Sequence, residues 1–363
     1  MSLRIDITGL PAERVRFAVS PLAELIAMLH ALAATEHHPW LVGWAAAVRG
    51  RLSPELSERL EEAEFLWRSS RADFLLPAEP GRSLEQELDD VDLIDDETYV
   101  ASALVTTCGS SRVHFGDTSP LTDPAARERA LEQAQACGTA QEAFAERLLA
   151  DSAAVRTRVR ETLEQCAEAF FDAEWPGIAA RLAADVRAKT DLRERKGVRA
   201  ALEAVSAALT MVESMDGASV VVDKLQDNAT SARGAGLSLV PSIFGSPHLF
   251  AVHARGWKPV LQYPVVEQPE PAQVPLDAVA RRLEALAHPV RLRLVRTLAR
   301  GPRTTSELAR AWQLTAPEVS RHLAVLRKAG LLTAERRGRY VYYALDLTTV
   351  SGLGTDLLTA VLR

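Results

Sequence analysis

The most constraining feature of this chain lies near its C-terminal end, where two short helical patterns follow each other across a tight turn. Each pattern opens with a threonine three residues ahead of a glutamate, in 304-TTSE-307 and again in 315-TAPE-318. This spacing is typical of a capping box, which begins a helix. A helix-turn-helix is therefore predicted, with Gln313-Leu314 as its turn and 316–329 as its second helix.

Apolar spacing extends this pattern into a small, nearly self-contained unit. Two further helices are predicted ahead of it, over 276–287 and 290–300, and the segment 332–345 alternates as a β-hairpin does. Arg336-Arg337-Gly338-Arg339 would form the hairpin tip, and Gly330 would end the preceding helix in the left-handed conformation. The residues expected on the buried faces are Leu276, Val279, Leu283, Leu286, Leu294, Val295, Leu298, Leu308, Trp312, Val319, Leu323 and Leu326.

Charge is unevenly distributed along the chain. The formal net charge is −6, yet residues 275–345 hold 14 Arg and Lys against 5 Asp and Glu, a local balance of +9. The rest of the chain carries 28 basic against 43 acidic residues, a balance of −15. Such asymmetry indicates a polyanion-binding segment attached to a different module. A helix in the major groove, with an arginine-rich hairpin on the phosphates beside it, predicts double-stranded DNA as the partner.

The predicted base contacts lie in the first turns of the second helix. Ser320 and Arg321 are the main candidates. Glu318 is expected to accept a hydrogen bond from cytosine, and Ala316 to touch thymine methyl groups.

Five further residues complete the predicted interface. Thr315 is either a DNA contact or only the cap of the helix. His322 is either a contact or a histidine packed at the seam between two helices. Phosphate or minor-groove contacts are expected from the three arginines of the hairpin tip, Arg336, Arg337 and Arg339.

Several separated segments of this unit match a known family in order and spacing. The runs 286-LAHPVRLRLVRTL-298, 307-ELA-309, 318-EVSRHLAVLRKAGLL-332 and 336-RRGRYVYYAL-345 resemble the ArsR-type winged-helix family of bacterial transcriptional regulators. The resemblance covers residues 276–346. It implies a homodimer, in which the helix after the linker and the last helix, 348–363, pack against their mates. Two-fold symmetry then implies a roughly palindromic operator.

The chain departs from the family pattern in two places. The segment equivalent to the cysteine-bearing helix of the family's thiolate metal sensors, 305-TSELARAW-312, holds no cysteine, which excludes thiolate metal sensing there. The second helix begins Ala316-Pro317-Glu318, where many members have polar, amide-bearing residues. The region ahead of the linker resembles a bacterial group in which an uncharacterised domain precedes a winged helix, and this brings no known activity.

The preceding part of the chain is rich in helical patterns. Helices are predicted over 21–34, 39–52 and 54–68, and a long helical region over 124–206 with interruptions near Trp175-Pro176-Gly177 and Lys189-Thr190. The segments 3–8 and 14–19 are interpreted as a short hairpin, and β-like runs are predicted over 218–225, 236–242, 248–254 and 259–265.

These patterns predict a mainly α (α+β) protein with two domains. Residues 1–266 form a helix-rich domain with a small antiparallel sheet, the proline-rich 267–275 is a linker, and 276–363 form the winged helix-turn-helix domain. No apolar run of about 18 residues and no signal peptide are present, so a cytoplasmic protein with no membrane partner is expected. The three cysteines, Cys108, Cys137 and Cys166, are scattered, which favours reduced thiols.

Candidate chemistry in the first domain is sparse. The sequence contains no G-x-S-x-G elbow, phosphate-binding glycine loop or dinucleotide fingerprint. His37-His38 is interpreted as part of a loop, Cys108 and His114 as unrelated neighbours, and Ser242 as a turn residue. The acidic run 85–97 lacks a calcium-loop pattern and is interpreted as a solvated helix end. Neither a catalytic site, a metal site nor a cofactor is predicted.

The sequence therefore indicates a homodimeric, sequence-specific transcriptional regulator, either a repressor or an activator, whose first domain senses a small-molecule effector or mediates interaction. One alternative is an enzyme-type first domain tethered to, or autoregulated by, the winged helix; a His–nucleophile pair or perturbed carboxylates in a pocket would favour it. The other is a winged helix that binds protein, favoured if the arginine-lined face is buried against the acidic domain.

Overall fold

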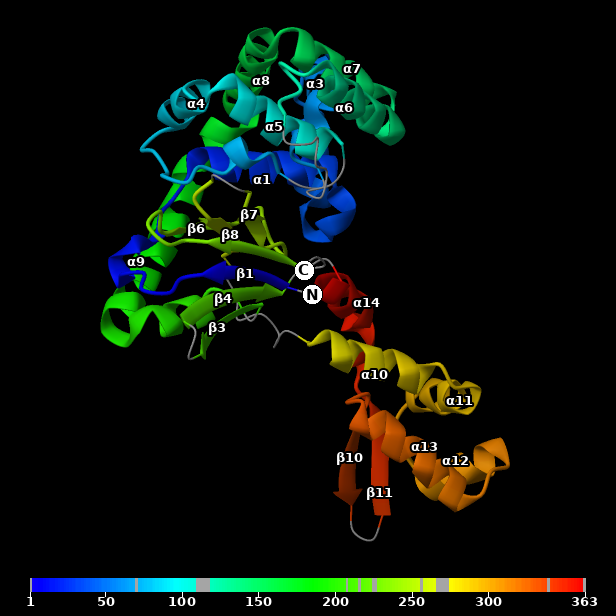
Figure 1. Ribbon diagram of the computed structural model, residues 1–363. Helices are drawn as coiled ribbons and strands as arrows, with labels where there is room; N and C mark the ends of the chain where they lie inside the picture. The colour runs from blue at the N-terminus through cyan, green and yellow to red at the C-terminus, as the bar shows by residue number, and fades with distance from the viewer. Residues whose placement is uncertain are drawn as a thin grey trace. The chain divides into compact units, whose positions relative to one another are not determined.

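The computed structural model describes residues 2–68, 71–108, 118–206, 208–214, 217–223, 227–254, 257–265, 274–337 and 340–361. The chain divides into two compact units, residues 1–268 (unit 1) and 269–362 (unit 2). Figure 1 shows the helices and strands of both units. Within the described ranges, no helix combines the length and apolar character needed to span a bilayer.

Two four-stranded mixed sheets form the β part of unit 1. Sheet 1 has the order β3-β4-β1-β5, in which β1 is antiparallel to β4 and parallel to β5. Sheet 2 has the order β2-β6-β8-β7, in which β2, β6 and β8 are parallel and β7 is antiparallel. The strands are β1 Ser2–Asp6, β2 Val15–Phe17, β3 Leu209–Ser214, β4 Gly217–Asp223, β5 Asn228–Ser231, β6 Leu237–Ser242, β7 Phe250–Val252 and β8 Val260–Pro264.

The sequence predictions for this β part were wrong in two respects. The expected hairpin of 3–8 with 14–19 does not form, because β1 joins sheet 1 while β2 joins sheet 2. The expected small antiparallel sheet is replaced by two mixed sheets. Every residue of β6 and β8 is buried, as is typical of parallel strands covered on both faces. In the sequence, such strands appear as continuous apolar runs. These runs do not show whether neighbouring strands are parallel or antiparallel.

Helix α1, Pro21–Ala33, lies at the centre of unit 1. Ser20 caps it by accepting a hydrogen bond from the Ala23 backbone N–H. All its residues from Pro21 to Leu32 are buried, because it packs on β6 on one side and on α4 on another (Figure 1). The sequence predicted this helix, over 21–34.

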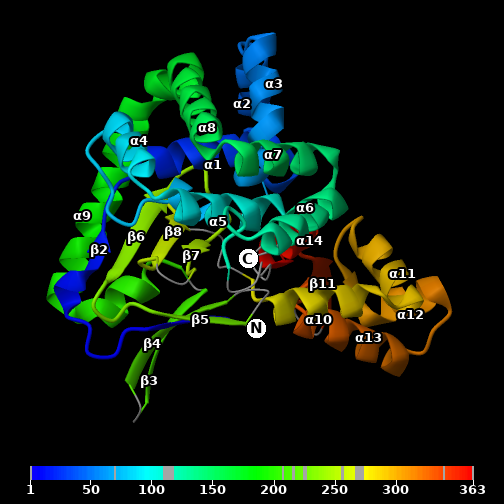
Figure 2. The same ribbon diagram turned by 45° about the horizontal axis from the view of Figure 1, so that its top comes forward.

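The remaining helices of unit 1 surround α1 and the sheets. The α-helices are α2 Val42–Arg49, α3 Pro54–Ala63, α4 Leu84–Asp92, α5 Asp96–Thr107, α6 Pro124–Cys137, α7 Thr139–Ala150, α8 Ser152–Cys166 and α9 Asp172–Glu203, and the π-helix η6 spans Ala167–Phe171. The short 3-10 helices are η1 Ala12–Arg14, η2 Thr35–His37, η3 Pro39–Leu41, η4 Glu64–Leu66 and η5 Asp73–Leu75. Figure 2 shows α9 running past the strands, and it contacts β2 and β6 of sheet 2 and β3 of sheet 1.

The breaks of the long helical region differ from those expected. Helix α9 continues through Pro176 and through 189–190, so both predicted interruptions were wrong. Pro176 lies inside α9, in the segment that follows the π-helix η6. The helices separate instead at Gly138 and Asp151, and α9 kinks at Gly197, whose φ of 86° suits glycine.

Unit 2 has a winged-helix topology. Its elements are α10 Leu276–Leu286, α11 Pro289–Leu298, β9 Arg303–Thr304, α12 Thr305–Trp312, α13 Ala316–Lys328, β10 Leu332–Arg337, β11 Tyr340–Leu345 and α14 Leu347–Val361. The strands form a sheet of order β10-β11-β9. Helices α10 and α14 pack together, and Arg282 Nη1 lies 2.6 Å from Asp356 Oδ2.

Candidate nucleic-acid interface

The turn between α12 and α13 fixes how the second helix leaves the first. Gln313 has a φ of 54°, in the left-handed region that non-glycine residues seldom adopt. The Leu314 backbone N–H then donates to the Ala309 carbonyl at 3.0 Å. A capping box begins each helix, formed by Thr304 with Glu307 and by Thr315 with Glu318. The predicted helix-turn-helix and both predicted capping boxes are confirmed.

Burial divides α13 into a packed side and an exposed side. Val319, Leu323 and Leu326 have 0% exposure and lie in the core of unit 2, as predicted. Because these residues recur at helical spacing, the positions between them face outward. The exposed residues of the first turns are Ala316, Pro317, Ser320, Arg321 and Ala324.

The two residues predicted as main base contacts are neighbours on this exposed side. Ser320 and Arg321 lie in the first two turns of α13, and Ala316 begins the helix. The N-terminal residues of the second helix are those that reach base edges in helix-turn-helix proteins. The arrangement therefore suits the predicted roles, which stay predictions.

The capping box uses Thr315 and one carboxylate oxygen of Glu318, two residues that were predicted to contact DNA. Glu318 Oε2 accepts from the Thr315 backbone N–H at 2.9 Å and from the Thr315 hydroxyl at 2.7 Å. These hydrogen bonds lower the pKa of the Glu318 carboxyl, which therefore stays ionised. Thr315 acts as a cap here, and Glu318 Oε1 is the oxygen that the cap leaves for a base.

His322 lies at the seam between α13 and the start of α11. Its half-buried ring has its centroid 4.9 Å from that of His288. His288 Nδ1 accepts from the Val290 backbone N–H at 3.2 Å and so caps α11. Desolvation, with the neighbouring His288, lowers the pKa of His322. Of the two interpretations given for His322, this position matches a histidine packed at the seam between two helices.

The wing pairs with the strand that precedes α12. In the β10–β11 hairpin Arg336 lies opposite Val341, and β9 adds Arg303 opposite Tyr343. Arg336 is exposed. Of the other two arginines of the tip, only the backbone of Arg337 is described, and Arg339 lies outside the described residues.

The core of unit 2 holds most of the residues expected there, with exceptions on α10 and α12. Val279 is buried on α10, whereas Leu276 and Leu283 are 53% and 40% exposed. Trp312 is only partly buried, and its indole N–H donates to Thr297 Oγ1 at 3.0 Å.

Three exposed basic residues near the interface were not singled out from the sequence. Arg327 and Lys328 lie on the last turn of α13, and Arg303 lies on β9 beside the wing. All three belong to the segment of positive charge balance, which was the available signal. Only the pairing of β9 with β11 brings Arg303 to the wing.

The candidate residues of unit 1 that sequence analysis interpreted as structural have the following surroundings. Ser242 ends β6, where its buried Oγ accepts from the Gly245 backbone N–H at 2.8 Å. Burial raises the pKa of the Cys108 thiol to about 12, and His114 lies outside the described residues. Two carboxylates of the acidic run 85–97 form ion pairs with Arg160 of α8, Asp89 at 2.8 Å and Asp92 at 2.5 Å.

His37 and His38 follow α1 as expected, but their environment was not foreseen. His38 has 0% exposure and His37 is half-buried. Both rings lie beside His30 and His248, residues that are far apart in the sequence.

Comparison with known proteins divides the chain at a similar place. Residues 1–269 match a family model described as a family of unknown function (DUF5937), and residues 286–335 match a helix-turn-helix domain model.

Three similar proteins of known name each match about a quarter of the chain. The HTH-type transcriptional repressor SmtB of Mycobacterium tuberculosis is 43% identical over 82 residues, which are 23% of this chain and 60% of that protein. The HTH-type transcriptional regulator NmtR of the same organism is 40% identical over 84 residues, 22% of this chain and 70% of NmtR. The solved winged helix-turn-helix domain Mb0332 of Mycobacterium bovis is 31% identical and covers 27% of this chain and 89% of its own, with a TM-score of 0.21. The chain thus spans 60% of the length of SmtB.

Proposed function

We propose that the chain is a sequence-specific DNA-binding transcriptional repressor. It belongs to the DUF5937 family of unknown function, and it ends in an ArsR-type winged helix-turn-helix. The observation that carries the proposal is the exposed side of α13, where Ser320 and Arg321 stand in the first turns of a well-capped second helix. The names of the relatives SmtB and NmtR support the same reading.

The two parts of the interface have different tasks in this proposal. The first turns of α13 enter the major groove, where the Arg321 guanidinium donates to guanine O6 and N7 and Ser320 bonds a neighbouring base. The arginines of the wing, Arg336, Arg337 and Arg339, bind phosphates or enter the minor groove. Neutralised phosphates release counterions, which gives affinity without sequence preference, while α13 supplies the discrimination.

A second copy of the chain completes the proposed DNA reader. Helices α10 and α14 leave large apolar side chains exposed, 53% at Leu276, 40% at Leu283, 48% at Leu358 and 47% at Val361. In the ArsR-type homodimer that the resemblance implies, the equivalent helices pack against their mates. Two α13 helices related by a two-fold axis then require a roughly palindromic operator.

Unit 1 is the proposed site of control. A ligand that binds unit 1 with different affinity in two conformations changes the population of the DNA-binding one. A small-molecule effector acting through unit 1 is therefore part of the proposal.

Replacement of Arg321 tests the proposed base contact. The preference of the protein for a duplex selected from a random library over a scrambled duplex should fall about 5- to 150-fold in Arg321→Ala, because a bidentate base contact contributes about 1–3 kcal/mol of discrimination. Fluorescence anisotropy at fixed salt measures both affinities. Arg82→Ala, which removes an equal charge from an exposed position of unit 1, is the matched control and should leave the preference unchanged. An equal loss for both duplexes would show that Arg321 binds only phosphate.

A further inference from the structure

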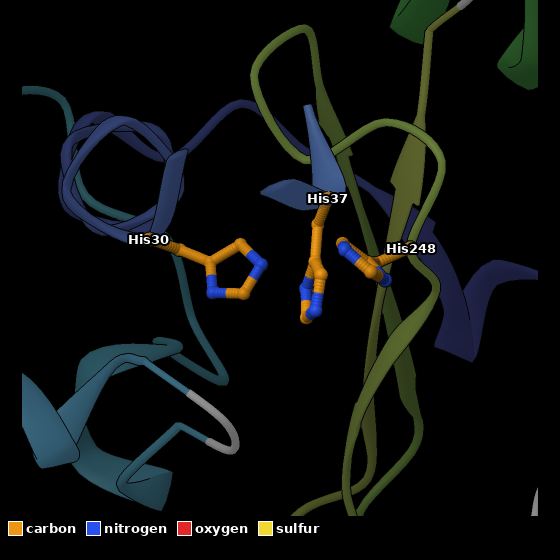
Figure 3. Close-up of side chains that lie close together, drawn as sticks. All are labelled: His30, His37 and His248. Atoms are coloured by element: carbon orange, nitrogen blue, oxygen red, sulfur yellow. The ribbon is translucent and has the colours of Figure 1, made fainter. Parts of the chain in front are cut away.

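Four imidazole rings meet in unit 1 beyond the C-terminal end of α1. His30 comes from α1, His37 from η2 and His248 from the connection between β6 and β7, and Figure 3 shows these three rings lying close together. We call these three residues the histidine cluster. His30 and His248 are buried, with 2% and 8% exposure, and the fully buried His38 lies beside them.

Hydrogen bonding fixes the tautomer of His30. Its Nδ1 lies 3.0 Å from the Trp67 carbonyl oxygen, which accepts but cannot donate, so Nδ1 carries the proton. Nε2 is then a lone-pair nitrogen, and this buried atom has no hydrogen-bond partner among the described residues. A histidine that donates one ring N–H to a backbone carbonyl and turns the other nitrogen toward its neighbours has the arrangement of a metal ligand.

The three rings direct nitrogen atoms toward one small volume. One ligand nitrogen from each ring lies within 4.8 Å of the others. The buried Nδ1 of His37 likewise has no hydrogen-bond partner among the described residues. A tetrahedral zinc ion with Zn–N bonds of about 2.0–2.1 Å holds its nitrogens about 3.3 Å apart. Binding therefore requires a modest approach of His37 and His248, which lie on a short 3-10 turn and a connection rather than on a long helix.

The hydrogen bonding of His30 suits a cation rather than an anion. An anion requires N–H donors, but the only proton of His30 is given to the Trp67 carbonyl. In this tautomer Nε2 carries a lone pair, which a cation can accept.

A buried arginine is the competing feature of this region. The Arg71 guanidinium carbon lies 3.8 Å from the centre of the Phe250 ring, which is also in contact with His30 and His248. None of its side-chain nitrogens has a hydrogen-bond partner among the described residues. The buried Glu24 carboxylate, which interacts with it electrostatically, offsets part of its charge. An anion bound by Arg71 is the alternative that an experiment has to separate from a metal ion.

We propose that His30, His37 and His248 bind a divalent transition-metal ion of borderline softness, such as Zn²⁺, Co²⁺ or Ni²⁺. Imidazole nitrogens select these ions over Mg²⁺ and Ca²⁺, which prefer oxygen. Three protein ligands leave a fourth position open. This site is distinct from the thiolate site that the sequence of α12 excludes, and it lies where sequence analysis expected no metal.

Titration of the chelator-treated full chain with Co²⁺ tests the site, with visible d–d absorption as the readout and Zn²⁺ displacement as confirmation. We expect saturation at one ion per chain. His37→Gln should weaken binding by more than about 100-fold, since loss of an outer-sphere partner alone typically costs 10–100-fold. His30→Gln should have the same effect, and far-ultraviolet circular dichroism establishes that each apo variant is folded. If the variant at the buried His30 does not fold, His37→Gln, at a half-buried position, provides the test.

Control variants separate the cluster from other donors in the chain. His253→Gln removes an imidazole of unit 1 outside the cluster. His288→Gln breaks the imidazole pair with His322, and Cys137→Ser removes an exposed thiol. All three should bind Co²⁺ like the wild type. Because the titration contains no DNA, its result is independent of the proposed regulatory function.

Three results would overturn the proposal. The first is the absence of saturable Co²⁺ or Zn²⁺ binding by the wild type. The second is equal binding by His37→Gln and His253→Gln, or a loss confined to His288→Gln or Cys137→Ser. The third is a rise in the unfolding temperature with inorganic phosphate but not with Zn²⁺, which would assign the region to an anion held by Arg71.

Discussion

Glu87 is the buried carboxylate that fastens the start of α1 to α4. Its Oε2 accepts from the Leu22 backbone N–H at 2.7 Å and from the Ser20 hydroxyl at 2.9 Å, while Oε1 accepts from the Gly81 backbone N–H at 2.9 Å. Burial raises the pKa of the Glu87 carboxyl to about 7 from its ordinary 4.5, although these hydrogen bonds lower it.

The raised pKa predicts a pH-dependent stability. Because the folded state holds the Glu87 proton more tightly than the unfolded state, the contribution of this group is greatest below pH 4.5 and is lost as pH rises through 7. Glu87→Gln removes this dependence. The free energy of unfolding of the variant, relative to the wild type, should therefore rise by up to about 3 kcal/mol between pH 4.5 and 8. Urea unfolding at a series of pH values measures it.

A neighbouring residue provides the control. Glu85 lies exposed on the same helix, so Glu85→Gln should follow the wild-type profile. A difference between Glu87→Gln and the wild type that does not change with pH would contradict the assigned protonation behaviour.

Single residues of this kind could not be identified from the sequence. Glu87 stands in an acidic run, and nothing in its spacing shows that it alone packs on Ser20. The histidine cluster joins positions 30, 37 and 248, which only tertiary structure brings together. By contrast, Thr315 and Glu318 were predicted as a cap because their hydrogen bonds span three residues.

At the scale of elements, α10 and α14 carry the apolar surface of unit 2. Replacement of the 48% exposed Leu358 by glutamate should shift the proposed dimer toward monomer, because the interface would bury an unpaired charge at a cost of several kcal/mol. Sedimentation velocity over a concentration series measures the shift. We expect the wild type to sediment as a dimer at concentrations where Leu358→Glu is largely monomeric.

The same substitution at a remote exposed leucine is the control for this experiment. Leu93, 82% exposed in unit 1, should tolerate glutamate with no change in sedimentation. A monomeric wild type, or a Leu358→Glu variant that remains dimeric, would refute an interface built on α14.

Elements differ in how far the sequence specifies them. Helices α1, α12 and α13 were predicted because caps and apolar spacing act over a few residues. The strands β6 and β8 were found, but their parallel pairing was not. Sheet order depends on partners far away in the chain; β1, for example, pairs with β4 across more than two hundred residues. Local sequence patterns do not predict such pairing.

At the scale of the whole molecule, opposite charge balances mark two different tasks. Residues 275–345 carry a balance of +9 within a chain of net charge −6. A basic segment alone gives affinity for any polyanion, with steep dependence on salt. Sequence discrimination is the additional property that the proposed repressor requires, and α13 is the element to which we assign it.

The most direct test measures the binding of the purified full chain to two DNAs over a salt series. One is DNA from the region upstream of its own coding sequence, and the other is a duplex selected from a random library. Each is compared with a scrambled duplex. We predict that at least one of these DNAs binds at physiological salt with a Kd of about 10⁻⁸ M or tighter, and far more tightly than its scrambled duplex. Equal binding to all duplexes at about 10⁻⁵ M, falling steeply with salt, would contradict it.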